Sequence, residues 1–331
     1  MSFGTRFLRH PERFPEAPRG EAWGGRELTL ELPGGPYRLS GLSAAQEEAL
    51  RATFPGSLRA AGAPVAATGS GPLPIPLPTP TATPTPIPIL LQRAAAAEFL
   101  AVDTRGWDYA LDFDWAPAAV RLAGLGLAGR IDWRPELGGV LWTHEDGGER
   151  FPGIFENFLR VLVAYRLLDL GGVVLHSAGV VRDGAAFLFL GRSGAGKTTV
   201  ARLSQAQGAE VLSDDLNALC AGAAAGTAGT GCAVLKLPFT GDLGERRAVR
   251  PAVPLGALLR LVQATADALA PLSRAETLAG MRACAPFVNV DPHRRERLEE
   301  VLLDLAAAAA PRAFALRFSL QGGFWSILSE K

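Results

Sequence analysis

The feature that most constrains this chain is the segment GRSGAGKT at residues 191–198, which matches the pattern GxxxxGK[ST]. It follows an apolar run, AAFLFLG at 185–191, that is typical of a buried strand, and it precedes TTVARLSQAQ, which suits a helix. A glycine-rich turn between a strand and a helix presents backbone N–H groups at a helix N-terminus, where they can bind phosphate. The segment therefore predicts an α/β fold with a P-loop that holds the phosphates of a nucleotide.

The positions of this loop have distinct expected roles. Gly194 and Gly196 let phosphate approach the backbone closely, because neither residue has a Cβ. Lys197 is expected to reach the β and γ phosphates of ATP, and the Thr198 hydroxyl to bind Mg²⁺. The residues expected to contact the nucleotide are Gly191, Arg192, Ser193, Gly194, Ala195, Gly196, Lys197, Thr198 and Thr199.

Two acidic residues follow the predicted helix at the end of a second strand. AEVLSDD at 209–215 is a short apolar run that ends in Asp214 and Asp215. A right-handed strand–helix–strand unit brings the carboxyl ends of its two strands to one edge of the sheet. We therefore expect one carboxylate to hold Mg²⁺ and the other to accept a proton. The alternative is that SDD caps the next element, because Ser and Asp are strong N-cap residues.

A predicted hairpin places a histidine beside the loop. The run VVLHSAGVV at 173–181 is separated from the strand before the loop by Asp183-Gly184, a pair that favours a tight turn. With these two as the turn residues, the register puts His176 opposite Gly191. There the histidine can stabilise phosphate or influence the aspartate pair. The alternative is a purely structural histidine.

Composition and charge exclude several classes of protein. Lys+Arg and Asp+Glu both total 33, so no surplus charge favours nucleic acid or an anionic membrane, and we expect neither as a partner. The cysteines at 220, 232 and 284 follow no zinc-site spacing and indicate no disulfide framework. The first residues lack the apolar core of a signal peptide, and no run is long and apolar enough to span a membrane. We therefore expect a cytoplasmic protein.

The chain divides into four expected regions. These are a β-rich N-terminal region, a Pro/Thr-rich linker, an α+β accessory region and a catalytic domain, at residues 1–70, 71–92, 93–154 and 155–331. The first region contains one predicted helix near 43–53. From Pro72 to Pro88 nearly every second residue is proline, which favours extended polyproline II and disfavours a helix or a central strand. We interpret this segment as a linker; the alternative is a docking ligand for a partner.

The ordered set of His176, the loop at 191–198 and Asp214-Asp215 resembles the HPr serine kinase/phosphorylase family and its HPr-kinase-like relatives, including those of peptide-modification gene clusters. The resemblance is clearest over residues 155–239. It implies a P-loop core of the HPr kinase/phosphoenolpyruvate carboxykinase type with an additional N-terminal α+β region. It also implies an ATP- and Mg²⁺-dependent kinase that phosphorylates a serine hydroxyl of a protein or peptide.

The same resemblance implies catalytic roles for Lys197, His176, Asp214 and Asp215. Asp214 matches the general base, and Asp215 is its neighbour on the metal side, with Thr198 as the other metal ligand; the two aspartate roles can also be exchanged. The chain departs from the HPr enzymes at 221–231, where AGAAAGTAGTG stands in place of a Gly/Asn-rich signature. Phosphorylase activity, a hexamer and HPr itself as the substrate are therefore not expected.

Two other functions fit the same residues. One is a kinase for a small-molecule hydroxyl, and the other is a non-catalytic, nucleotide-gated module that presents a peptide to other enzymes. The size of the acceptor distinguishes a small-molecule kinase from a peptide kinase. ATP binding without any phosphoryl transfer would indicate the nucleotide-gated module. Lys236, Arg246 and Arg247 are candidates for a substrate-side cation, with solvated surface residues as the alternative. The sequence leaves the oligomeric state open.

Overall fold

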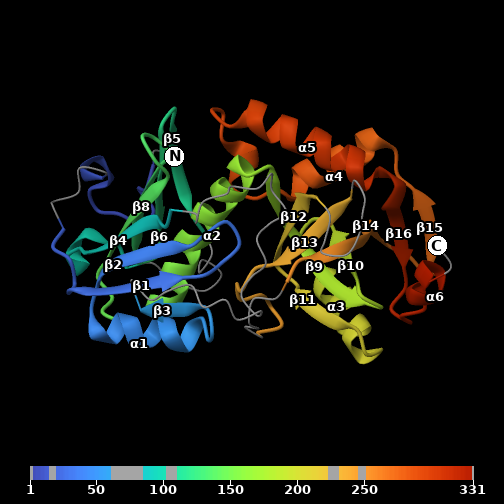
Figure 1. Cartoon of the computed structure of the whole chain (residues 1–331), viewed down its shortest axis with the longest axis horizontal. Helices are drawn as coiled ribbons and strands as arrows, with labels where there is room; N and C mark the ends of the chain where they lie inside the picture. The colour runs from blue at the N-terminus through green and yellow to red at the C-terminus, as the bar shows by residue number, and fades with distance from the viewer. Residues whose placement is uncertain are drawn as a thin grey trace. The chain divides into compact units, whose positions relative to one another are not determined.

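The computed structural model describes residues 3–14, 20–60, 85–101, 110–222, 231–244 and 251–329. The described residues up to 163 form one compact unit, unit 1, and those from 164 onward form a second, unit 2. Each unit contains a large sheet with helices, which confirms the α/β class (Figure 1). None of the helices in the described ranges is long and apolar enough to cross a membrane.

Unit 1 is built on an eight-stranded sheet with the order β3-β1-β2-β4-β8-β7-β6-β5. Its strands are β1 (Arg26–Leu30), β2 (Tyr37–Leu42), β3 (Leu58–Ala60), β4 (Ile87–Arg93), β5 (Asp112–Ala116), β6 (Ala119–Gly124), β7 (Leu127–Asp132) and β8 (Gly138–Thr143). Helix α1 (Ala44–Thr53) lies in this unit, and helix α2 (Phe151–Asp169) begins in it. The predicted helix at 43–53 is confirmed, and Ser43 and Gln46 close its first turn with a capping box.

The linker predicted at 71–92 is wrong at its C-terminal end. Ile87–Arg93 forms β4 in the middle of the sheet, where it pairs in parallel with both β2 and β8. Pro88 is exposed, and the pairing with β8 begins only at Ile89, so the missing N–H of the proline breaks no ladder bond there. The rest of the predicted linker, up to residue 84, lies outside the described residues.

The same sheet corrects the predicted division of the N-terminal half. The strands of 1–70 and those of 93–154 belong to one sheet, because β4 joins β2 to β8. The two expected regions are therefore one unit.

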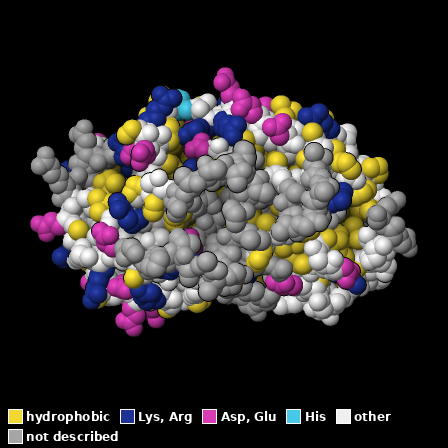
Figure 2. Space-filling model, viewed as in Figure 1, with side chains coloured by type: hydrophobic (Ala, Val, Ile, Leu, Met, Phe, Trp, Pro, Cys, Tyr) yellow, Lys and Arg dark blue, Asp and Glu magenta, His cyan; other side chains and the backbone are white. Residues whose placement is uncertain are grey.

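On the face shown in Figure 2, basic and acidic side chains are interspersed, in keeping with their equal totals in the sequence.

Unit 2 contains a second eight-stranded sheet, ordered β10-β9-β12-β13-β14-β16-β15, with β11 paired to β9. Its strands are β9 (Gly172–Arg182), β10 (Ala185–Leu190), β11 (Glu210–Ser213), β12 (Leu216–Ala221), β13 (Cys232–Lys236), β14 (Val253–Gln263), β15 (Ala268–Pro271) and β16 (Ala313–Phe318). Strand β10 pairs with β9 on one side and, in parallel, with β14 on the other. The pairings of β9, β12, β13, β14 and β10 therefore form a closed circuit.

Helices cover both faces of this second sheet. They are α3 (Lys197–Ala206), α4 (Arg274–Cys284), α5 (Arg295–Ala309) and α6 (Phe324–Ser329). Helices α4 and α5 lie on one side of the central strands and α3 lies on the other (Figure 1). Residues of α3 and α6 share one core with β9, β10, β14 and β16, including Val200, Phe318 and Trp325. The strand before the loop and the helix after it are therefore both fixed by burial.

Candidate functional site

The glycine-rich loop joins β10 to α3 through a tight turn. Gly194 and Gly196 have φ values of +77° and +99°, a region of backbone conformation that favours glycine. The Ala195 N–H donates to the carbonyl of Arg192 at 3.0 Å, which closes the turn. A Cβ at Gly191 would lie 2.5 Å from the Cβ of Ala195, so the first position also needs glycine. The sequence pattern thus corresponds to a compact turn at the start of a helix.

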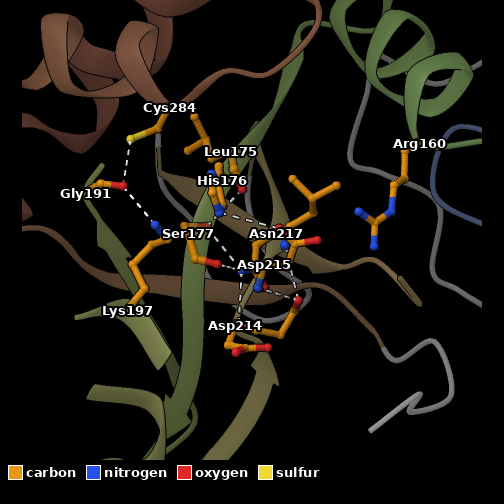
Figure 3. Close-up of polar contacts among 12 residues, drawn as sticks. Arg160, Leu175, His176, Ser177, Gly191, Lys197, Asp214, Asp215, Asn217 and Cys284 are labelled. Carbon is orange, nitrogen blue, oxygen red and sulfur yellow. Dashed lines mark hydrogen bonds and ion pairs between the residues drawn. The ribbon is translucent and has the colours of Figure 1, made fainter. Parts of the chain in front are cut away.

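Lys197 is buried against this loop rather than extended into solvent. Its Nζ donates to the carbonyls of Gly191 and Arg192 at 3.0 and 3.2 Å (Figure 3). Burial lowers the pKa of the ammonium group, while the negative charges of Asp215 and Asp214 oppose that shift. The cation is held at the mouth of the turn, where it would meet an anion bound by the loop amides.

The predicted hairpin is confirmed in its register. Ala185 pairs with Arg182 and Leu190 with Ser177, so the sequence-based register holds along the whole ladder. His176 comes next on β9, at the edge where β10 leads into the loop. Its Nε2 lies 3.5 Å from Oδ1 of Asp215 (Figure 3). The fold therefore brings His176 together with the second residue of the aspartate pair.

The predicted strand–helix–strand unit is also present, with one addition. Strand β11 pairs antiparallel with β9, which itself runs antiparallel to β10, so β10 and β11 point the same way with β9 between them. The two aspartates follow β11 directly, and the Ser177 N–H donates to the Asp215 carbonyl at 2.9 Å. The Ser213 hydroxyl caps this turn by accepting the amides of Asp215 and Leu216. The next element is the strand β12, so the capping alternative holds for the serine of SDD, which closes the turn into that strand.

The two carboxylates differ in exposure. Asp214 is 6% exposed, and its Oδ1 accepts the Leu243 N–H at 3.4 Å. Its Oδ2 is buried and has no hydrogen-bond partner within the part of the chain that the structure describes. A cavity of about 50 Å³ adjoins Asp214 and is also lined by Phe239, Gly241 and Leu243. The Asp215 side chain, in contrast, is 23% exposed and faces His176.

The donors suited to a metal are few. Among the described residues, no cluster of three or more His, Cys, Asp or Glu side chains has the spacing of a metal site. Thr198 and Thr199 are half-buried in the first turn of α3. Mg²⁺ commonly takes only one or two carboxylates from the protein and completes its shell with phosphate oxygens and water. The unpartnered Oδ2 of Asp214 is a carboxylate donor of that kind, and the Thr198 hydroxyl is a neutral oxygen donor.

The structure adds residues that the motif search missed. Gln263, at the end of β14, donates from Nε2 to the Gly194 carbonyl at 2.9 Å. Asn217 is fully buried in β12 and donates to the backbone of Ser177 at 2.8 Å. A polar residue inside the apolar run LNALCA was the only sequence signal for Asn217. Cys284 of α4 places its buried thiol 4.0 Å from the Gly191 carbonyl, and burial raises its pKa.

Of the three candidate substrate-side cations, the structure describes Lys236. Lys236 ends β13 and is 3% exposed, so it is not a solvated surface residue. Its Cα pairs with that of Asn217 across the sheet. Arg246 and Arg247 lie outside the described residues.

The C-terminal half of the chain matches a known protein family. The family described as SynChlorMet cassette protein ScmC matches residues 155–330, which include the loop, His176 and the aspartate pair. No curated protein matches this chain. Because the match covers more than half of the 331 residues, the chain belongs to the ScmC family.

Proposed function

We propose that this protein is an ATP- and Mg²⁺-dependent kinase that transfers the γ-phosphoryl group to a hydroxyl, in the first instance a serine of a protein or peptide. The observation that carries the proposal is one sheet edge that holds the turn at 191–196, Lys197 and the pair of His176 with Asp215. The proposal includes a P-loop core of the HPr kinase/phosphoenolpyruvate carboxykinase type. The parallel β10 and β11 with β9 between them support that core.

The loop and α3 supply the anion-binding part of the site. The first turn of α3 contains no acidic residue, so its unpaired amides and dipole favour a phosphate group. Lys197 would exchange its two carbonyl partners for phosphate oxygens, a stronger charge-assisted contact. ATP supplies the phosphoryl group, and Mg²⁺, when bound, neutralises the charge on its β and γ oxygens.

The exposures favour exchanging the aspartate roles first implied by the family resemblance. A general base must reach the hydroxyl of the acceptor, and Asp215 is the more exposed carboxylate. We assign it to take the hydroxyl proton as the oxygen bonds to the γ-phosphorus and the bond to ADP breaks. The Nε2 of His176 lies 3.5 Å from the Asp215 carboxylate. A protonated His176 would stabilise the ionised form of Asp215 through its positive charge. Asp214, whose Oδ2 is buried without a partner in the described chain, is left for Mg²⁺ with Thr198.

The first test is MgATP binding by titration calorimetry, for the wild type and for Lys197→Met. Losing a charged hydrogen-bond donor should weaken binding by about 10- to 100-fold. Arg202→Met, an exposed cation on the same helix, is the matched control and should bind normally. Absence of MgATP binding by the wild type would overturn the proposal.

The second test follows transfer of labelled γ-phosphate to serine-containing peptides and to small hydroxyl compounds. Asp215→Asn should lower kcat by about 10²- to 10⁴-fold at an unchanged Mg²⁺ requirement. Asp214→Asn should instead raise the Mg²⁺ concentration needed for half-maximal rate. Asp242→Asn removes an equal, exposed charge near Lys197 and serves as the control. Transfer only to small compounds would point to a small-molecule kinase, and ATP binding with no transfer to a nucleotide-gated module.

A further inference from the structure

Asn217 links the two strands that carry the polar residues of the site. Its Nδ2 donates to the Ser177 carbonyl at 2.8 Å, to the Ser177 hydroxyl at 3.1 Å and, more weakly, to the Ser213 carbonyl at 3.4 Å. Ser177 directly follows His176 on β9, and Ser213, the last residue of β11, directly precedes Asp214. One buried amide therefore connects the backbone on both sides of the site (Figure 3).

The strand pairing at this point is irregular. The register between β11 and β9 shifts between Val211 and Ser213, so the backbone leading into the aspartates is displaced along β9. Regular ladder pairing resumes only at Leu216, opposite His176. Between these points, the backbone hydrogen bond from the Ser177 N–H to the Asp215 carbonyl and the bond from the Asp215 N–H to the Ser213 hydroxyl hold the turn. Asn217 donates hydrogen bonds to both Ser177 and Ser213.

The Asn217 side chain packs closely against the backbone of Gly179. A Cβ on Gly179 of β9 would collide with the Asn217 side chain, whose atoms are its three nearest neighbours. The Asn217 Oδ1 is buried and has no hydrogen-bond partner among the described residues, so the hydrogen bonds of this side chain come from its Nδ2. The three donor contacts are what an amide adds at this site.

We propose that Asn217 is a positioning residue that fixes Asp214 and Asp215 relative to His176. This inference rests on the proposed function for its kinetic consequence, but not for its structural one. A displacement of about 1 Å in a reacting group can cost about 10²-fold in rate. We therefore expect Asn217→Leu to lower kcat by about 10- to 100-fold with little change in the KM for MgATP, because the loop at 191–196 is untouched.

A matched control separates positioning from stability. Thr277→Val in α4 also removes a buried side-chain hydrogen bond, from Oγ1 to the Ser273 carbonyl at 2.9 Å. It should lower the melting temperature by a similar amount and leave kcat unchanged. A loss of kcat in Asn217→Leu no larger than in Thr277→Val would overturn the inference.

Gly179→Ala tests the same contact while keeping Asn217 in place. The added methyl group displaces the asparagine, so kcat should fall as it does for Asn217→Leu. In the double variant Gly179→Ala/Asn217→Ala, the second change should cost little beyond the first, since both act through one side chain. Fully additive losses would contradict a shared cause.

Hydrogen exchange gives a readout that does not depend on catalysis. In Asn217→Leu, the amides of Ser177 and Asp215 should exchange faster than in the wild type, while amides in the middle of β10 keep their protection. Unchanged exchange at these two amides would overturn the inference even if the kinase proposal holds. Faster exchange at these amides in Asn217→Leu, together with a wild-type protein that transfers no phosphate, would instead overturn the proposed function alone.

Discussion

Replacing Gly196 with alanine tests why the loop has glycine where α3 begins. Gly196 has a φ of +99°, and the left-handed region costs an L-residue about 1–2 kcal/mol. A Cβ there would also lie 2.5 Å from Cζ of Phe318, a ring that is buried in the core of unit 2. Overpacking of this kind costs about 1–3 kcal/mol. Together the two effects predict a loss of about 2–5 kcal/mol in the free energy of unfolding.

Gly194→Ala is the matched comparison within the same loop. Its φ is +77°, but a Cβ there would meet nothing within 4 Å. It should therefore lose only the backbone contribution of about 1–2 kcal/mol. Replacing the Phe318 ring with the smaller leucine side chain in the Gly196→Ala background removes the clash. It should recover part of the difference in unfolding free energy between the two alanine variants.

Urea denaturation followed by tryptophan fluorescence measures these differences, because Trp325 packs in the core that contains Phe318. The difference between the two midpoints, multiplied by the slope of the transition, gives the packing contribution. Equal destabilisation by Gly196→Ala and Gly194→Ala would refute the reasoning. It would mean that the Phe318 ring moves away from the added methyl group with no loss of stability.

Three further predictions concern unit 2. Tyr165→Phe removes the 2.8 Å hydrogen bond to the buried Asp291 and should cost about 1–3 kcal/mol in chemical denaturation. Leu302→Ala, at a fully buried position of α5, should cost about 2–5 kcal/mol, whereas Leu303→Ala, 40% exposed, should cost little. Burial raises the pKa of Cys220 to about 12 and of Cys232 to about 11, above the ordinary 9.0. Unfolded thiols therefore ionise first, and between pH 9 and the folded-state pKa the free energy of unfolding should fall by up to about 1.4 kcal/mol per pH unit for each of these two thiols. Cys220→Ala should remove the contribution of one thiol from that slope.

Local sequence signals predicted the loop and the hairpin because both depend on neighbouring residues. The turn at Asp183-Gly184 has positive φ at both positions, as a tight hairpin turn requires, and this fixes where His176 falls. The glycines of the loop follow from the same kind of short-range geometry. The α/β class and the meeting of His176 with Asp215 could therefore be expected from the sequence.

Long-range pairing was beyond the reach of the same reasoning. The central position of β4 depends on β8, about fifty residues later, so the proline-rich composition misled the prediction. The burial of Asp214 depends on the segment around Leu243, which no spacing rule connects to the aspartate pair. Asn217 had no motif to mark it, because its role depends on strands that meet only in the folded sheet.

The closed circuit of strands in unit 2 has a consequence for synthesis of the chain. Strand β10, which leads into the loop, gains its second neighbour only when β14 has been made, and Leu190 and Val253 are far apart in the sequence. Until then β10 presents an open, strongly apolar edge of the kind that pairs with other chains. Non-local pairing of this type also forms slowly. The nascent chain is therefore most prone to aggregation between completion of α3 and emergence of β14, and chaperone demand should peak in that interval.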